Sequence, residues 1–195
     1  MWVTPRDLEI LARVRDARAC DSATFTDLFP TVRSLRQRLW RLTRERFLKI
    51  HRIGNQRAYS LDRRSVPILG LPAKEVRVSR VAVARYLLYA RIRRELQAEG
   101  YVLNGQDQVG RAMVARAWRG GRRIAVAVCG PEASPRAVQG LVHRLRSLVN
   151  PFGPLADELM IFGLAHAPRV ISKLPVAYRG RVTIRPLKPV TASGS

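Results

Sequence analysis

Hydrophobic positions recur with helical spacing in the first quarter of the chain. In the segment TVRSLRQRLWRLTRERFLKI, Leu35, Leu39 and Leu42 stand at i, i+4 and i+7, which places them on one face of a helix. Thr31 or Ser34 can cap the first turn of this helix. The pattern therefore predicts an amphipathic helix whose leucine stripe packs against a core.

Two further helices are expected before this one. Thr4, Pro5 and Asp7 form a typical helix start, because Thr caps, Pro suits the first turn and an acid follows. A second, short helix is expected near Ser22 to Phe29. The apolar positions expected along the first helix are Leu8, Leu11 and Ala12.

A β-hairpin is predicted directly after the leucine-bearing helix. Two short runs with alternating apolar residues cover Phe47 to Ile53 and Ala58 to Leu61, and a Gly/Asn turn lies between them. Arg57 falls at or beside the tip of this hairpin. Three helices followed by a hairpin are the element order of a winged helix-turn-helix, in which the hairpin is the wing.

The second half of the chain predicts a small α/β domain of α-β-β-β-α-β-α-β order. The expected elements are a helix from Ser79 to Gly100, strands at Tyr101 to Leu103, Ala112 to Trp118 and Arg123 to Cys129, a helix from Ser134 to about Val149, a strand at Leu159 to Leu164, a short helix at Pro168 to Lys173 and a strand at Val182 to Ile184. The apolar stripe expected on the long helix is Val81, Ala84, Leu87, Leu88, Ile92 and Leu96.

The fold class expected is therefore α+β, with two domains. Residues 1–64 form the winged helix-turn-helix, residues 65–78 form a linker punctuated by Pro and Gly, residues 79–187 form the α/β domain and residues 188–195 form an exposed tail. A helix at the position of the long one can instead pair two protomers, so a homodimer stays open.

Charge points to a polyanionic partner. The formal net charge is +22, of which residues 1–70 carry +8 (15 basic minus 7 acidic) and residues 71–195 carry +14 (21 minus 7). Neutralising nucleic-acid phosphates releases counterions and favours such binding. An anionic membrane surface is the competing partner, but no apolar run approaches the roughly 20 residues of a membrane span. The N-terminus lacks a signal-peptide pattern, so we expect a cytoplasmic protein with no membrane partner.

The sequence predicts no catalytic or metal-binding site. Cys20 and Cys129 are far apart, and His51, His143 and His166 are scattered, so zinc and a disulfide framework are not indicated. Neither a Walker A motif nor a dinucleotide glycine fingerprint is present. We expect a protein without cofactor, metal or enzymatic activity.

The arginine-rich faces of the leucine-bearing helix are the candidate DNA-binding surface. Guanidinium groups aligned along a helix can fork onto guanine edges or contact phosphates in a major groove. A solvated helix face in an arginine-rich protein is the alternative, since the chain has 32 Arg against 4 Lys. The expected DNA-contacting residues are Arg33, Ser34, Arg36, Gln37, Arg38, Arg41 and Arg44 on the helix, and Asn55, Gln56 and Arg57 at the wing.

The passage LRQRLWRLTRERFLKIHRIGNQRAYSL resembles the replication-relaxation family, whose members are encoded on plasmids and integrative elements and include mobilisation accessory proteins. The segments RRIAVAVCG and ELMIFGLAHAPRVISKL are similar to the C-terminal half of that family. The resemblance implies a C-terminal domain with a restriction-endonuclease-like fold, in which active members hold magnesium with an Asp on one central strand and Glu-x-Lys on the next.

This sequence departs from that magnesium-binding pattern. The segments Ala112 to Trp118 and Arg123 to Cys129 contain no Asp or Glu, and the nearest acids, Asp107 and Glu132, are expected in loops. Phosphodiester hydrolysis with a divalent ion requires carboxylates that converge on it. The C-terminal half is therefore expected to be a degenerate, non-catalytic version of the fold.

The leading functional hypothesis is a double-stranded DNA-binding accessory protein of a mobile element. It would act in conjugation or replication, at an origin of transfer or replication, and would dock a relaxase or replication protein. A winged-helix transcriptional repressor is the alternative, because a winged helix defines how DNA is held and not why. A divergent nuclease that uses Asp107 with Glu132 is a third hypothesis, and an RNA-associated protein is a fourth, disfavoured because no aromatic RNA-binding platform is present.

Overall fold

The computed structural model describes residues 3–109, 112–129, 136, 140–141, 157–163, 172 and 181–187. It confirms a mixed α+β chain, and the residues that it describes form two sheets, one of three strands and one of five. The chain divides into two compact units, residues 1–90 and residues 91–195, and helix α4 contributes to both.

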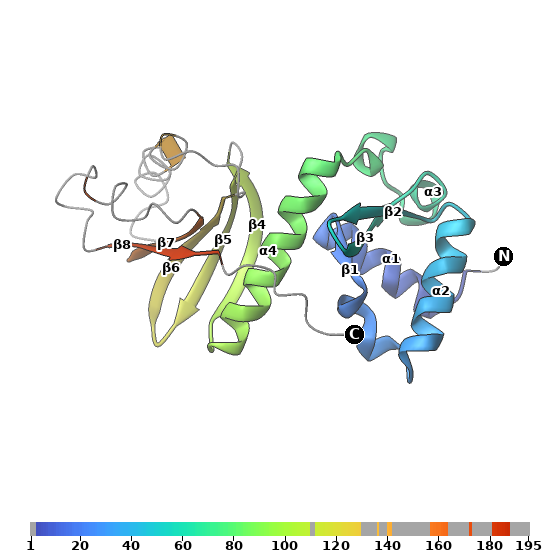
Figure 1. Cartoon of the computed structure of the whole chain (residues 1–195), viewed down its shortest axis with the longest axis horizontal. Coiled ribbons are helices and arrows are strands. Elements are labelled where there is room, and N and C mark those ends of the chain that lie inside the picture. The colour runs from blue at the N-terminus through green and yellow to red at the C-terminus, as the bar shows by residue number, and fades with distance from the viewer. Residues whose placement is uncertain are drawn as a thin grey trace. The chain divides into compact units, whose positions relative to one another are not determined.

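The first unit begins with helices and a three-stranded antiparallel sheet of order β1-β3-β2 (Figure 1). Its elements are α1 (Pro5–Ala17), β1 (Cys20–Asp21), the 3-10 helix η1 (Ser22–Leu28), α2 (Val32–Arg44), β2 (Leu48–Ile53), β3 (Gln56–Leu61), α3 (Ser65–Leu69), the 3-10 helix η2 (Ala73–Val76) and the first part of α4 (Arg80–Ala98).

Helix α1 begins with a reciprocal cap. The Thr4 side chain accepts a hydrogen bond from the Asp7 backbone N–H (3.3 Å), and the Asp7 carboxylate accepts one from the Thr4 backbone N–H (2.8 Å). The expected apolar face was wrong at Leu8, which is exposed. The buried positions are Asp7, Ile10, Leu11 and Val14. The buried face is centred on Asp7 and Val14, and Leu8, one residue after Asp7, lies about 100° around the helix from that centre.

Helix α2 confirms the leucine stripe. Leu35, Leu39 and Leu42 are each at most 1% exposed and belong to one core cluster with residues of α1 and the sheet. Thr31 is the N-cap, and its hydroxyl oxygen accepts a hydrogen bond from the Ser34 backbone N–H at 3.1 Å. The exposed side of α2 is consequently fixed by the burial of its leucines.

The three-stranded sheet packs on both of its faces. Strands β2 and β3 form the expected hairpin, with Ile53 opposite Gln56 across a turn in which Gly54 has φ +56°. Tyr59 and its neighbours on one face join the core of α1 and α2, whereas Ala58 on the other face packs with Val83 and Leu87 of α4. Successive residues of β3 point to opposite faces, so one strand serves both layers.

The expected linker, residues 65–78, contains two short helices, α3 and η2. Leu69, Leu71 and Val76 pack against the core cluster of α1, α2 and the sheet. The Leu71 backbone N–H donates to the Val66 carbonyl at 3.0 Å, which folds this connector onto itself.

Helix α4 starts at the predicted cap. The Ser79 hydroxyl accepts a hydrogen bond from the Ala82 backbone N–H at 3.2 Å. The predicted stripe was wrong at Val81, which is 57% exposed, because the face of α4 that packs is centred on Val83 and Leu87. The buried apolar positions of α4 are Val83, Leu87, Tyr89, Ile92 and Leu96.

The second unit is built on a five-stranded sheet of order β4-β5-β6-β7-β8. Its strands are β4 (Val102–Val109), β5 (Ala112–Arg119), β6 (Arg122–Val128), β7 (Glu158–Gly163) and β8 (Val182–Pro186). The pairs β4·β5 and β5·β6 are antiparallel, whereas β6·β7 and β7·β8 are parallel. Gly120 and Gly121, both with positive φ, form the turn between β5 and β6.

Strand β4 extends further than the sequence indicated. The expected strand ended at Leu103, but β4 continues to Val109, so the expectation that Asp107 lies in a loop was wrong. The polar sequence NGQDQ does not predict a strand, but backbone pairing with β5 orders it as one. The helices expected at 134–149 and 168–173 lie largely outside the described residues. The few residues of these two segments that are described, Arg136, Gly140, Leu141 and Ser172, are helical.

Candidate nucleic-acid interface

Unpaired cations line the exposed side of α2. Arg33, Arg36, Gln37 and Arg41 are all exposed, as the sequence predicted. Within the described part of the chain, none of these three arginines forms an ion pair with a carboxylate. Their guanidinium groups are therefore available to an external anion without first leaving an internal partner.

The β2–β3 hairpin adds two arginines to this region. Arg57 and Arg52 are directly opposite one another across the two strands, and both are exposed. Asn55 and Gln56 at the turn are exposed as well. Sequence reasoning missed Arg52, although the Gly54 turn sets the register that pairs it with Arg57.

Tyr59 of β3 is influenced by arginines of both α2 and the hairpin. Burial raises the pKa of the Tyr59 hydroxyl, while the positive charges of Arg57 and Arg36 act on it in the opposite sense. Arg36 on α2 and Arg57 on β3 thus both act electrostatically on the same buried tyrosine.

Arg38 has a different role from its neighbours on α2. It forms a bidentate ion pair with Asp7, whose side chain is completely buried, and Arg38 itself is only 20% exposed. Burial of Asp7 favours its neutral form, but the Arg38 guanidinium and the Thr4 donors hold the pKa of this carboxyl below its ordinary value. The pair joins the start of α1 to the middle of α2, and so positions the helix.

Two other predicted contact residues on α2 already have partners. The Ser34 hydroxyl donates to the Thr31 carbonyl at 2.8 Å, as part of the helix cap. The Arg44 guanidinium lies 5.4 Å from the centre of the Trp40 ring. Trp40 is 59% exposed and was not predicted, although it follows Arg36 by four residues and so falls on the same face of the helix.

Carboxylates do not gather around a reactive centre in the described residues. No group of three His, Cys, Asp or Glu residues is arranged there to hold a metal ion. Glu158 on β7 pairs with Arg122 at 2.8 Å, and Glu132 lies outside the described residues. Cys20 and Cys129 are buried and form no disulfide. Of the helices in the described residues, none is long and apolar enough to cross a membrane.

Comparison with known proteins leaves the geometry as the basis for assigning a function. The chain matches no protein-family model, and no curated protein sequence matches it. The arginines of α2 and of the β2–β3 hairpin are thus the features on which a functional proposal is built.

Proposed function

We propose that this protein binds double-stranded DNA through α2 and the β2–β3 hairpin, as a winged helix-turn-helix. The observation that carries the proposal is the presence of exposed arginines on both elements, among them Arg36 on α2 and Arg57 on β3. Neither arginine has an ion-pair partner among the described residues. Duplex DNA offers a helix-sized groove bordered by phosphates, which fits a basic helix beside a basic hairpin.

The two elements would divide the work of recognition. Arg36, Gln37 and Arg41 project from α2, where a guanidinium can donate two hydrogen bonds to one guanine. Arg57 and Arg52 on the hairpin would contact phosphates or the adjacent minor groove. Base contacts would select the sequence, while phosphate contacts would set position and affinity.

The biological role that we propose is that of an accessory protein of a mobile element. The protein would bind at an origin of transfer or replication, and the second unit would serve as the platform for a relaxase or replication protein. Repression of transcription uses the same mode of DNA binding. Footprinting on the DNA of the host element separates the two roles, since protection at the origin supports mobilisation and protection over a promoter supports repression.

Binding without cleavage is part of the proposal. Strands β5 and β6 carry no carboxylate, and the β7 residue Glu158 is paired with Arg122. Supercoiled plasmid incubated with magnesium or manganese should stay intact. Nicking by the unchanged protein that disappears in both Asp107→Ala and Glu132→Ala would replace this proposal with a metal-dependent nuclease.

Binding of matched nucleic acids tests the proposal as a whole. Fluorescence anisotropy would compare one sequence as duplex DNA, single-stranded DNA and duplex RNA at one salt concentration. The proposal requires duplex DNA to bind most tightly, because an RNA duplex has a deep, narrow major groove that a helix cannot enter. Equal affinity for all three would indicate binding by charge alone, and tighter binding of RNA would point to an RNA-associated protein.

A further inference from the structure

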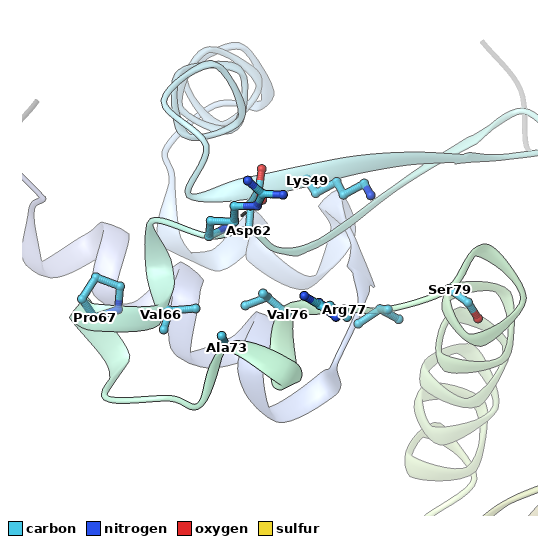
Figure 2. Close-up of a pocket in the computed structure, with 10 residues that line it drawn as sticks. Lys49, Asp62, Val66, Pro67, Ala73, Val76, Arg77 and Ser79 are labelled. Carbon is cyan, nitrogen blue, oxygen red and sulfur yellow. Dashed lines mark hydrogen bonds between the residues drawn. The ribbon is translucent and has the colours of Figure 1, made fainter.

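An open hollow lies in the first unit at the base of the β2–β3 hairpin, away from α2. Its volume is about 710 Å³, which is within the range of small-molecule sites. Figure 2 shows Lys49 of β2 and Asp62, the residue after β3, on one side, with Val76 and Arg77 of the connector facing them. The residues that line it are Lys49, Asp62, Arg63, Val66, Pro67, Ala73, Val76, Arg77, Val78 and Ser79.

The lining combines an apolar surface with an excess of positive charge. Half of the lining residues are Val, Pro or Ala, and three are cationic, namely Lys49, Arg63 and Arg77. None of these three cations forms an ion pair within the described residues. Asp62 is the single acid of the lining, and its carboxylate accepts a hydrogen bond from the Arg63 backbone N–H at 2.7 Å.

Backbone hydrogen bonds hold the walls of the hollow in place. On the strand side, the Asp62 N–H and the Ser65 hydroxyl both donate to the Phe47 carbonyl, each at 2.9 Å. On the connector side, the Arg77 N–H donates to the Lys74 carbonyl at 3.3 Å. The hollow is thus formed before any ligand arrives, which lowers the entropic cost of binding.

Lys49, the strand residue of the lining, lies on the opposite face of the sheet from the hairpin arginines. Lys49 is paired with Ser60, and His51, two residues along β2, is paired with Ala58, which packs against α4. Arg52 is an odd number of residues from Lys49 and therefore points to the other face. A ligand beside Lys49 would not compete with DNA held by α2 and the hairpin arginines.

We infer that this hollow binds a small amphipathic anion, an apolar body that carries a phosphate or carboxylate group. The apolar side chains would cover the body, and Lys49, Arg63 and Arg77 would contact the anionic group. The inference does not depend on the proposed binding of DNA, because none of the residues that line the hollow is among the proposed DNA-contacting residues.

Phenyl phosphate is a suitable probe, with phenol and inorganic phosphate as its two halves. Titration of the full chain, followed by amide chemical shifts, should give saturable changes confined to residues around the hollow. Phenyl phosphate should bind about tenfold more tightly than either half, since both the apolar surface and the cations contribute. Inorganic phosphate that binds as tightly as phenyl phosphate, or shifts spread over the basic surface, would overturn the inference.

Single charge removals provide the matched test. Arg77→Gln and Lys49→Gln, from opposite walls, should each weaken phenyl phosphate about tenfold, the loss of one charge-assisted hydrogen bond. Lys74→Gln removes the same charge from η2 at a residue outside the lining and should leave affinity within about twofold. Equal weakening by Lys74→Gln would contradict the site, and if one wall variant fails to fold the other decides.

Competition with DNA tests whether this site is distinct from the proposed DNA-binding surface. Phenyl phosphate should stay bound when an excess of duplex DNA is added. Displacement by DNA would show that these cations belong to the nucleic-acid interface, and the inference of a separate site would be wrong. Absence of DNA binding alongside intact phenyl phosphate binding would instead count against the proposed function only.

Discussion

The exposed arginines of α2 and two arginines of the second unit, Arg122 on β6 and Arg185 on β8, occupy different electrostatic settings. In the second unit, Arg122 pairs with Glu158 at 2.8 Å and Arg185 pairs with Glu99 at 2.7 Å. In the first unit, Arg36 and Arg41 on α2 are exposed and form no ion pair among the described residues. Arg36 and Arg41 therefore carry the same charge as Arg122 and Arg185 but are not neutralised by a neighbouring carboxylate.

This difference indicates that the ion-pair state of the arginines, more than the net charge of a segment, predicts where a polyanion binds. A paired arginine must leave its carboxylate before it can contact a phosphate, and the abandoned carboxylate then repels the ligand. An unpaired arginine loses only water and releases counterions from the DNA. Counting charge by segment gives +8 for residues 1–70 and +14 for residues 71–195, which would favour the second half, whereas the interface that we propose lies in the first.

The largest expected effect is on DNA affinity. The double variant Arg36→Ala/Arg41→Ala should weaken duplex binding about a hundredfold or more, because each bidentate contact contributes about 1–3 kcal/mol. Anisotropy titration at fixed salt measures the change. The double variant Arg122→Ala/Arg185→Ala removes the same charge from paired positions and should alter affinity less than about threefold. Equal losses of affinity in the two double variants would contradict the difference between the α2 arginines and the paired arginines.

Arg38 tests the comparison within α2 itself. Arg38→Ala should lower the free energy of unfolding by about 2–3 kcal/mol, because it leaves the buried Asp7 carboxylate without its partner. Arg36→Ala, two residues away and exposed, should change it by less than about 0.5 kcal/mol. Urea unfolding of both variants gives the values. Similar stability of the two variants would mean that the Asp7–Arg38 pair does not anchor α2.

The Asp7–Arg38 pair also predicts a dependence on pH. The pKa of Asp7 in the folded protein lies below its ordinary value of 3.8, so its contribution is complete above that pH and is lost as the pH falls through the lower, folded pKa. The gap in unfolding free energy between the unchanged protein and Arg38→Ala should be constant from pH 7 to 5 and shrink below pH 4. A gap that stays constant down to pH 2 would contradict the assignment.

The smallest expected effect on DNA affinity is that of substitutions in the β2–β3 hairpin. Arg57→Ala should weaken binding to all duplex sequences evenly by a few-fold and reduce the salt dependence of binding by about one phosphate contact. Arg52→Ala should behave alike, because the two side chains are cross-strand partners. Binding of cognate and scrambled duplexes distinguishes this from base recognition. A loss confined to the cognate duplex would assign Arg57 a base contact.

Local patterns explain what the sequence could predict. The spacing of Leu35, Leu39 and Leu42 fixed the buried side of α2, since helical periodicity and burial are local properties. The Thr4 cap and the Gly54 turn were equally local, because each depends on residues within a few positions.

Tertiary partners explain what the sequence could not predict. Arg38 pairs with an acid 31 positions earlier in the chain, and no local pattern reports that distance. A weak signal existed, because Arg38 is three residues from Leu35 and four from Leu42 and so borders the buried stripe. Strand β4 was underestimated beyond Leu103 because pairing with β5, and not its polar composition, orders it.

Salt dependence of duplex binding tests the central claim most directly. An interface that neutralises about six phosphates should lose roughly a thousandfold in affinity between 50 and 200 mM salt. In Arg36→Ala/Arg41→Ala the slope of log affinity against log salt should fall by about two contacts, and in Arg122→Ala/Arg185→Ala it should not change. Affinity that barely responds to salt, or a slope lowered only by the second pair of substitutions, would contradict DNA binding through α2.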